Sequence, residues 1–220
     1  AEDRATVLVF GLADISANEA MSVAMGSSCE VSAAAHLPQS PAGNIPELGS
    51  PGKAVTAFRL EGISQSVAYR KAKLDELLRP FGELGSLDAA KSRAFWKSVR
   101  DVMPFAGRTG RPVWKISTTP SFAPSIAGGI NAVTGAHYFY DWAGGLLWLE
   151  MPDEKTQENA GRAALAGRGH ATLIRASGAA RASAEVFEPL DPVRAAISQR
   201  LKASFDPEGV LNPGRIYAES

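Results

Sequence analysis

The segment from Ala136 to Met151 constrains the fold most, because it reads as two short strands joined by a tight turn. The runs Ala136–Trp142 and Leu146–Met151 are apolar and aromatic, and Ala143-Gly144-Gly145 stands between them. Glycine adopts a positive φ at little cost, which suits the turn of a hairpin. A hairpin pairs its two strands antiparallel. The sequence therefore predicts a sheet that contains at least one antiparallel pair.

Strand and helix patterns are interspersed along the rest of the chain. Further strands are predicted at 5–12, 30–37, 54–61, 112–118 and 170–175. Helices are predicted at 14–25, 64–81, 87–103, 153–166 and 191–206. The first three elements predict a β-α-β unit, with Asp14 or Ser16 as the helix cap, and no internal repeat is visible. This order favours an α+β fold, a mostly antiparallel sheet with helices packed mainly on one face.

Two segments are predicted to lack regular structure. Residues 39–53 are rich in proline and glycine and read as a surface loop, and residues 119–135 read as a turn-rich stretch around Gly128-Gly129.

The last helix begins at Asp191-Pro192, a capping residue followed by a proline in the first turn. The large apolar residues of this last helix recur every four positions, and we expect them to be buried in this domain. They are Val193, Ile197, Leu201 and Phe205.

Charge and cysteine content exclude several classes of function. Lys plus Arg (23) equals Asp plus Glu (23), and the basic residues are scattered, which argues against nucleic-acid binding. The single cysteine, Cys29, excludes an internal disulfide and is expected to be a small buried residue. The histidines His36, His137 and His170 lack the spacing of metal ligands, so no metal site is expected.

Hydropathy predicts a cytoplasmic protein. No apolar run approaches the roughly 20 residues that cross a bilayer. The first residues, Ala1-Glu2-Asp3-Arg4, do not resemble a signal peptide.

Several motifs occur together in the order found in one flavoprotein family. The sharpest are Asp206-Pro207-Glu208-Gly209 and Asn212-Pro213-Gly214-Arg215, followed by Tyr217. Upstream stand Arg59-Leu60-Glu61-Gly62, Phe95-Trp96, Val113-Trp114-Lys115-Ile116-Ser117, Asp141-Trp142-Ala143-Gly144-Gly145 and Gly169-His170-Ala171-Thr172. With these motifs the chain resembles the E subunits of bacterial glycolate oxidase, which belong to the vanillyl-alcohol-oxidase-type flavoproteins. The resemblance spans roughly residues 6–218.

The resemblance implies a cap domain of an FAD-dependent oxidoreductase that oxidises glycolate, a small 2-hydroxy acid, to glyoxylate. Residues 1–190 would form the cap, and residues 191–220 would form a helix and tail that dock toward an FAD-binding domain. The glycine-rich stretch that receives the FAD pyrophosphate in this family has no counterpart here, since Gly128-Gly129 and Gly144-Gly145 lack its context. We therefore expect FAD in the full-length parent and none in this chain alone, which would be inactive by itself.

The resemblance also implies partners, namely a second flavin subunit and an iron–sulfur subunit. Through such a complex the protein would lie in the cytoplasm, at the surface of the inner membrane. A surface that normally meets the flavin domain would be bare here, so self-association is expected. A non-enzymatic α+β module for subunit assembly or small-ligand binding remains the alternative.

Four residues are candidates for the site, each with a structural alternative. His170 could act as a catalytic base near neutral pH, or it could be a packed strand residue. Arg59 and Lys115 could bind a substrate carboxylate, or they could be solvent-facing strand residues. Asn212 could contact the cofactor or anchor the tail, or it could belong to a simple turn.

Overall fold

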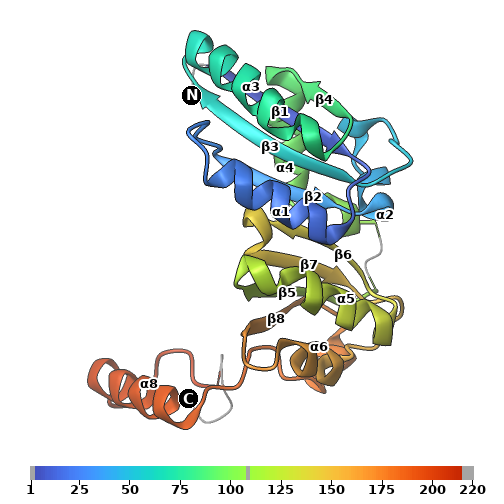
Figure 1. Ribbon diagram of the computed structural model, residues 1–220. Helices are drawn as coiled ribbons and strands as arrows, with labels where there is room; N and C mark the ends of the chain where they lie inside the picture. Colours follow the sequence, from blue (N-terminus) through green and yellow to red (C-terminus); the bar gives the residue numbers. More distant parts are fainter. Residues whose placement is uncertain (1–2, 108–109, 215–220) are drawn as a thin grey trace.

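The computed structural model describes residues 3–107 and 110–214, which form one long sheet with helices on both sides (Figure 1). The strands are β1 (Asp3–Phe10), β2 (Ala33–Leu37), β3 (Val55–Gly62), β4 (Leu84–Leu87), β5 (Val113–Thr118), β6 (His137–Asp141), β7 (Leu146–Glu150) and β8 (Gly169–Arg175). The helices are α1 (Asp14–Met25), α2 (Gln39–Gly43), α3 (Ser64–Leu78), α4 (Ala89–Arg100), α5 (Ala123–Thr134), α6 (Glu158–Leu165), α7 (Gly178–Ala182) and α8 (Pro192–Phe205). Short 3₁₀ turns are η1 (Pro46–Leu48), η2 (Arg79–Phe81), η3 (Met103–Phe105), η4 (Pro120–Phe122) and η5 (Trp142–Gly144).

The strand order shows that the sheet consists of two copies of one unit. The order is β4-β1-β3-β2-β6-β7-β5-β8, and the described pairs are all antiparallel. In each half, two strands joined by a helix are parallel to each other and are separated by the strand that follows them. The N-terminal repeat (β1-α1-β2-β3-α3-β4) thus has the same layout as the C-terminal repeat (β5-α5-β6-β7-α6-β8). The prediction of no internal repeat was wrong, because the duplication appears in the order of the strands in the sheet and not in the amino-acid sequence.

The predicted β-α-β unit therefore exists in a split form. Strands β1 and β2 flank α1 in the chain, yet both pair with β3, which lies between them. The predicted hairpin is confirmed, since Asp141 pairs with Leu146 across the turn. The α+β class with a mostly antiparallel sheet is confirmed as well.

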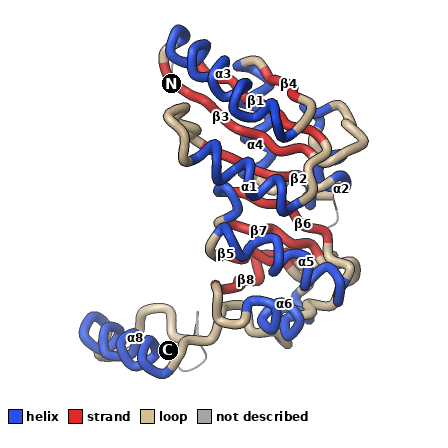
Figure 2. The backbone as a smooth tube through the Cα atoms, in the orientation of Figure 1, coloured by secondary structure: helices blue, strands red, loops and turns tan. Residues whose placement is uncertain are grey.

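Two apolar cores lie on opposite faces of the sheet. The larger core packs α1, α3, α5 and α6 against one face, through residues such as Met21, Leu74, Ile126 and Leu165. The smaller core packs α4 and α2 against the other face, mainly over the N-terminal repeat. Figure 2 shows the helices of both layers along the sheet. Most helices share one face, as predicted, and α4 is the main exception.

Four stretches differ from the prediction in secondary structure. Residues 123–134, expected to be turns, form α5, because Pro124 lies in the first turn and Ile126 and Ile130 share a buried face. The short strand β4 was not predicted, since Leu84-Gly85-Ser86-Leu87 is too short and too rich in small residues to show a strand pattern. The expected loop at 39–53 contains α2 and η1, and the helix expected at 153–166 is confined to Glu158–Leu165.

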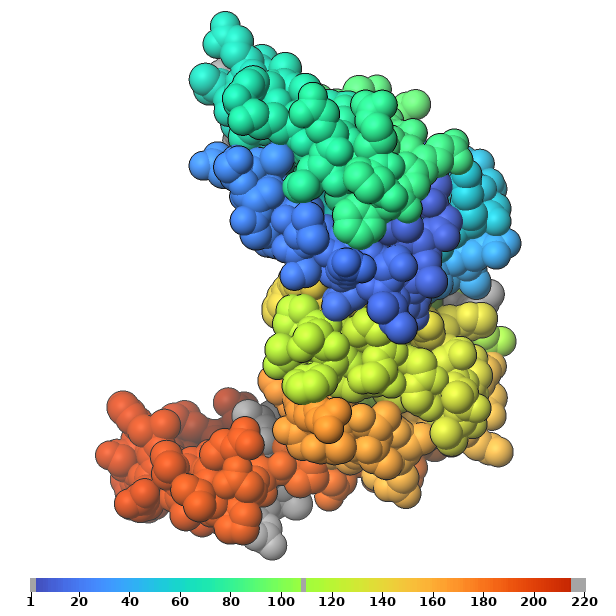
Figure 3. All heavy atoms as spheres, in the orientation of Figure 1, coloured from blue at the N-terminus to red at the C-terminus, as the bar shows by residue number. Residues whose placement is uncertain are grey.

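Helix α8 stands apart from the rest of the molecule, as a separate lobe in Figure 3. None of its residues is buried, and the exposed fractions of Val193 (69%), Ile197 (51%), Leu201 (59%) and Phe205 (79%) are large. The prediction that these side chains are buried in this domain was wrong. The periodicity was read correctly, but the surface that would cover them is not among the described residues. The division of the chain near residue 190 stays a prediction.

Candidate functional site

Three of the four candidate residues lie on one face of the sheet. Arg59 Cζ stands 5.3 Å from the centre of the Trp96 ring of α4, which places Arg59 on the α4 side. Lys115 is on the same side, because its Nζ lies 6.0 Å from the ring of Trp148, which packs against the smaller core. Strand pairing places His170 opposite Ser117, two residues from Lys115 on the same face. We call the part of this face on β5, β6, β7 and β8 the open face.

Lys115 lies between two indole rings on the open face. Its Nζ stands 5.3 Å from the ring of Trp142 and 6.0 Å from the ring of Trp148. A cation over the face of an indole is stabilised by the ring electrons. Within residues 3–107 and 110–214, no carboxylate forms an ion pair with Lys115. Its charge is therefore available to an anion that approaches this face.

The turn that carries Trp142 has an unusual backbone. Trp142 and Ala143 both have a φ of 52°, and Gly144 has a φ of 94°. A positive φ is costly for a bulky residue and is found where structure or function requires it. Asp141 supports the turn by accepting a hydrogen bond of 2.8 Å from the Trp142 N–H. The turn presents the Trp142 ring to solvent, with 61% of the residue exposed.

Arg59 is more heavily paired than Lys115. Its Nε donates to Ser32 Oγ at 3.0 Å and lies 3.1 Å from Glu61 Oε2. Much of its charge is thus met by Glu61, and it is less suited than Lys115 to bind a substrate carboxylate. Arg59 also acts on Asp141: burial raises the pKa of the Asp141 carboxyl, and the Trp142 N–H and the positive charge of Arg59 act in the opposite direction.

His170 and Asn212 lie apart from each other. His170 is exposed at the start of β8, and Asn212 is exposed in the tail after α8, with a φ of 50°. The structure thus brings Arg59, Lys115 and His170 to one face and leaves Asn212 separate from them. Arg215 and Tyr217, which share a motif with Asn212, lie outside the described residues.

A polar network behind the open face joins the two repeats. The β2–β6 contact consists of the single pair His36 and Tyr140, and we call this junction the seam. Asp14 of α1 accepts hydrogen bonds from Tyr138 Oη at 2.6 Å and Tyr140 Oη at 2.7 Å. His36 Nδ1 is 2.9 Å from Thr56 Oγ1, and its Nε2 is 3.3 Å from Asp14 Oδ1, without the alignment of a hydrogen bond.

Ionisation of the seam follows from this geometry. Burial alone would raise the pKa of Asp14, but the contacts from His36, Tyr138 and Tyr140 outweigh it and leave that pKa lowered. Burial and the negative charge of Asp14 raise the pKa values of Tyr138 and Tyr140 far above the usual range. At the seam, the Asp14 carboxylate is therefore ionised, and the hydroxyl groups of Tyr138 and Tyr140 are neutral. Asp14 or Ser16 was predicted to cap α1, but the cap position is Ala13 and no side chain caps the helix; the Asp14 carboxylate accepts from the two tyrosines instead.

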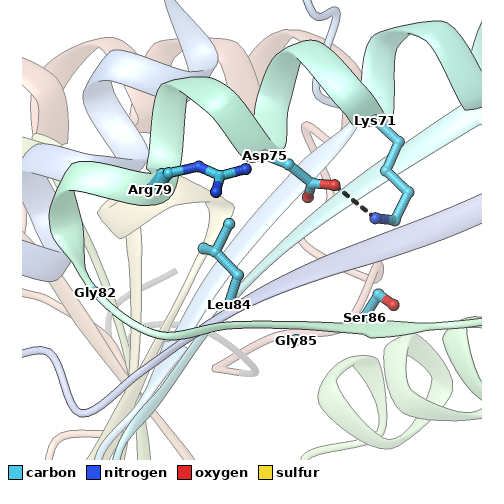
Figure 4. Close-up of a pocket in the computed structure, with 7 residues that line it drawn as sticks. All are labelled: Lys71, Asp75, Arg79, Gly82, Leu84, Gly85 and Ser86. Carbon is cyan, nitrogen blue, oxygen red and sulfur yellow. Dashed lines mark hydrogen bonds and ion pairs between the residues drawn. The ribbon is translucent and has the colours of Figure 1, made fainter.

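A separate cavity of about 410 Å³ lies at the other end of the sheet, between α3 and the edge of β4 (Figure 4). It is lined by Lys71, Asp75, Arg79, Gly82, Leu84, Gly85 and Ser86. These residues were not predicted as a site, because they come from separate elements that only the fold brings together and no sequence motif links them.

Neither a metal-binding cluster nor a membrane-spanning helix occurs in the described part of the chain. Among residues 3–107 and 110–214, no group of three or more His, Cys, Asp or Glu residues could hold a metal ion. Within the same ranges, no helix combines the length and the apolar character that crossing a bilayer requires. Gly128-Gly129 lies inside α5 and Gly144-Gly145 follows β6, so neither pair opens a helix after a strand as a phosphate-binding loop does.

Comparisons with known proteins find a matching domain model and a similar curated protein. The model of "FAD linked oxidases, C-terminal domain" matches residues 178–216, which include α7, α8 and the start of the tail. Glycolate oxidase subunit GlcE of Escherichia coli (strain K12) is 34% identical over 151 residues, which are 64% of this chain and 39% of that protein. The chain thus matches well under half of the length of this curated relative.

Solved structures show the same fold. A 4-ethylphenol oxidase from Gulosibacter chungangensis aligns with a TM-score of 0.63 and 12% identity, over 99% of this chain and 54% of that chain. p-Cresol methylhydroxylase aligns with a TM-score of 0.65 and 11% identity, over 97% of this chain and 52% of that chain. The chain spans about half of each. Residues 178–216 are thus similar to the C-terminal domain of FAD linked oxidases, a longer part of the chain is similar to glycolate oxidase subunit GlcE, and the chain has the fold of the two solved oxidases over the part that it covers.

Proposed function

We propose that this chain is the cap half of an FAD-dependent oxidoreductase that converts a small 2-hydroxy acid, glycolate, to the 2-oxo acid glyoxylate. One observation carries the proposal. The segment that matches the FAD-linked oxidases, residues 178–216, contains the helix whose apolar side chains are left exposed. A family-specific helix with an unburied apolar side indicates that the other half of the protein covers it.

Helix α8 lacks the packing that normally stabilises a helix of its length. An isolated helix shorter than about 12–15 residues is marginal in water, so most helices depend on packing. Helix α8 has 14 residues and buries none of them. Full burial of a Val, Leu, Ile or Phe side chain contributes about 1.5–3 kcal/mol. Covering Val193, Ile197, Leu201 and Phe205 would therefore stabilise both the helix and the complex.

The open face would then meet the substrate. The chemistry that FAD would supply from the other half is hydride acceptance, and this chain would supply the residues that bind the substrate and take its proton. Lys115 would bind the substrate carboxylate, since it has no ion pair of its own among the described residues, and Arg59 would contribute less because Glu61 and Ser32 occupy its Nε. His170 is the candidate base for the hydroxyl proton on this face. Asn212 would anchor the tail against the FAD-binding half.

The proposal extends to partners and location. GlcE is named as a subunit of glycolate oxidase, and we propose that this chain likewise works with a second flavin subunit and an iron–sulfur subunit. Such a complex would lie in the cytoplasm at the inner membrane surface. Without its partners, the exposed α8 side chains would favour self-association of the chain.

Flavin retention in the complex tests the proposal. The chain would be co-expressed with the polypeptide that carries the FAD-binding half, and flavin absorbance would be measured in the complex after gel filtration. The double variant Ile197→Asp, Leu201→Asp should elute alone and without flavin. The matched control is Val133→Asp on α5, which is 78% exposed and far from α8, and it should retain the flavin.

Two results would contradict the proposal. One is a complex that forms and holds flavin equally well with the α8 variant, since α8 would then have no role in docking. The other is a flavin-free complex with the unaltered chain, which would favour the non-enzymatic assembly module.

A further inference from the structure

The two repeats allow the two outer edges of the sheet to be compared. Strand β4 forms one edge and β8 forms the other, and each is the last strand of its repeat. Each follows a helix on the same face of the sheet, α3 before β4 and α6 before β8 (Figure 1). The segment that covers the edge of β8 therefore indicates what kind of segment could cover the edge of β4.

The edge of β8 is covered by the chain's own residues 184–188. Leu173 N donates to Val186 O at 2.8 Å, and Ala171 N donates to Glu188 Oε2 at 3.1 Å. Alternate backbone N–H groups of a strand point to the same edge, so the outward N–H groups of Ala171 and Leu173 are both satisfied by residues 184–188. Val186 also packs against the larger core.

One arginine of α6 holds the same segment from above. Arg162 Nη2 donates to Glu185 O at 2.7 Å and to Phe187 O at 3.2 Å. Its Nη1 lies 3.8 Å from Glu185 Oε2 and 3.7 Å from Glu188 Oε2. The C-terminal repeat thus holds a segment that carries two glutamates with a strand edge and one arginine of a helix.

The corresponding edge of β4 has no such cover. Phe10 N donates to Glu83 O at 3.0 Å, so the backbone groups of Leu84 and Ser86 alternate to the outer edge. No strand pairs with this edge among residues 3–107 and 110–214. The chain leaves β4 at Asp88, which caps α4, and α4 packs on the opposite face of the sheet.

The cavity under α3 lies at this bare edge (Figure 4). Leu84 and Ser86 line one side of it, and Lys71, Asp75 and Arg79 line the other. Lys71 Nζ pairs with Asp75 Oδ2 at 2.7 Å. Arg79 has no ion pair within the described part of the chain, which leaves one helix-side guanidinium above the edge of β4, as Arg162 lies above the edge of β8.

We propose that the groove between α3 and β4 binds an extended acidic segment of a protein partner, which adds to β4 as a further strand. The backbone groups of Leu84 and Ser86 would pair with the segment, and Arg79 would hold its carboxylate. Strand addition gains affinity from main-chain hydrogen bonds and specificity from side-chain contacts. A guanidinium suits a carboxylate because it offers a fork of donors. This site is independent of FAD and of the open face.

The chain supplies its own probe. A peptide with the sequence of residues 184–189, blocked at both ends, would be titrated into the full ¹⁵N-labelled chain, and amide shifts would be followed by NMR. The shifts should centre on Leu84 and Ser86. Arg79→Glu should weaken binding by about tenfold or more, which corresponds to about 1.4 kcal/mol. The matched control, Arg93→Glu on the exposed side of α4, should bind the peptide as the unaltered chain does.

Further arms identify the ligand chemistry. Replacing both glutamates of the peptide by glutamine should weaken binding to the same extent as Arg79→Glu. Three results would overturn the proposal: no shifts at Leu84 and Ser86 with millimolar peptide, equal affinity for the Arg79→Glu chain, or the same shifts with acetate alone. Shifts confined to Ala171 and Leu173 would also overturn it, because the peptide would then only displace residues 184–188 from β8.

Discussion

Replacing Asp14 with alanine should loosen the seam between the two repeats. The Asp14 carboxylate accepts hydrogen bonds from Tyr138 and Tyr140, which both belong to the C-terminal repeat, while Asp14 itself belongs to the N-terminal one. Among the described residues, β2 and β6 pair through one register position, His36 opposite Tyr140. The carboxylate is therefore a principal polar link across the seam.

The expected loss follows from the burial of the three partners. A hydrogen bond to a charged group contributes about 1.5–3 kcal/mol, and a buried group left without a partner adds a penalty. Tyr138 is partly exposed and can turn to water, but Tyr140 and His36 are buried (1% and 0% exposed). We therefore expect a loss of about 3 kcal/mol for Asp14→Ala. For a chain of this length that loss corresponds to a fall of about 6–12 °C in Tm.

Urea unfolding and thermal melting measure this loss, and a double-mutant cycle with Tyr140→Phe isolates the hydrogen bond. The two substitutions should be strongly non-additive, because each removes the same contact. Asp101→Asn is the control, since Asp101 forms an exposed pair with Arg100, and it should leave the urea midpoint unchanged. If Asp14→Ala behaves like Asp101→Asn, or if Asp14→Ala and Tyr140→Phe are additive, the account of the seam is wrong.

The pH dependence of the seam has a definite sign. The pKa of Asp14 is lowered in the folded protein, so its ionised form is stabilised by folding. This contribution is complete above the unfolded pKa of about 3.9 and is lost as the pH falls through the lower folded value. The unaltered chain should therefore lose more stability than Asp14→Ala when the pH is lowered below about 4.

Three further predictions concern the cofactor, the terminal helix and the strained turn. Calorimetric titration of the chain alone with micromolar FAD should give no stoichiometric binding, and one FAD bound per chain would contradict the view that the other half is required. A chain that ends after Leu190 should keep the Tm of the whole chain, since α8 buries no residue, and a clear fall would show that α8 packs on this domain. Gly144→Ala should cost about 1–3 kcal/mol, because Gly144 has a φ of 94° and the new Cβ would stand 2.8 Å from Asn18 Oδ1. Gly128→Ala in α5 is its control, since a Cβ there meets nothing within 4 Å, and a similar loss in both variants would refute the argument from strain.

The sequence predicted local structure better than it predicted burial. Strong patterns such as the hairpin around Gly144-Gly145 and the helix from Pro192 to Phe205 were found, because each is encoded in adjacent residues. The burial of Leu201 and Phe205 was predicted wrongly, since periodicity shows that a face is apolar and not what covers it. The duplication of the two repeats was missed because it appears in the order of the strands in the sheet, which local sequence patterns do not reveal.

The candidate site was predicted only in part. Arg59 and Lys115 were chosen for their charge on predicted strands, and the structure places them on one face of the sheet. Arg59 pairs with Glu61 whereas Lys115 lies over an indole ring, and this difference in their suitability for an anion is visible only in the structure. The exposed ring of Trp142 and its positive φ could not be read from the residue, since a tryptophan in a turn sequence is compatible with a buried position. The cavity beside β4 is lined from separate elements by Arg79 and Ser86, and no local pattern indicates such a site.

Hydrogen–deuterium exchange of α8 tests the central claim most directly. The amides of residues 193–205 would be followed in the chain alone and in the complex with the FAD-binding half. We predict rapid exchange in the chain alone, since α8 has no buried residue, and strong protection in the complex. Protection of α8 in the chain alone, or equally rapid exchange in both states, would contradict the claim that this chain is a cap whose last helix docks on the flavin-binding half.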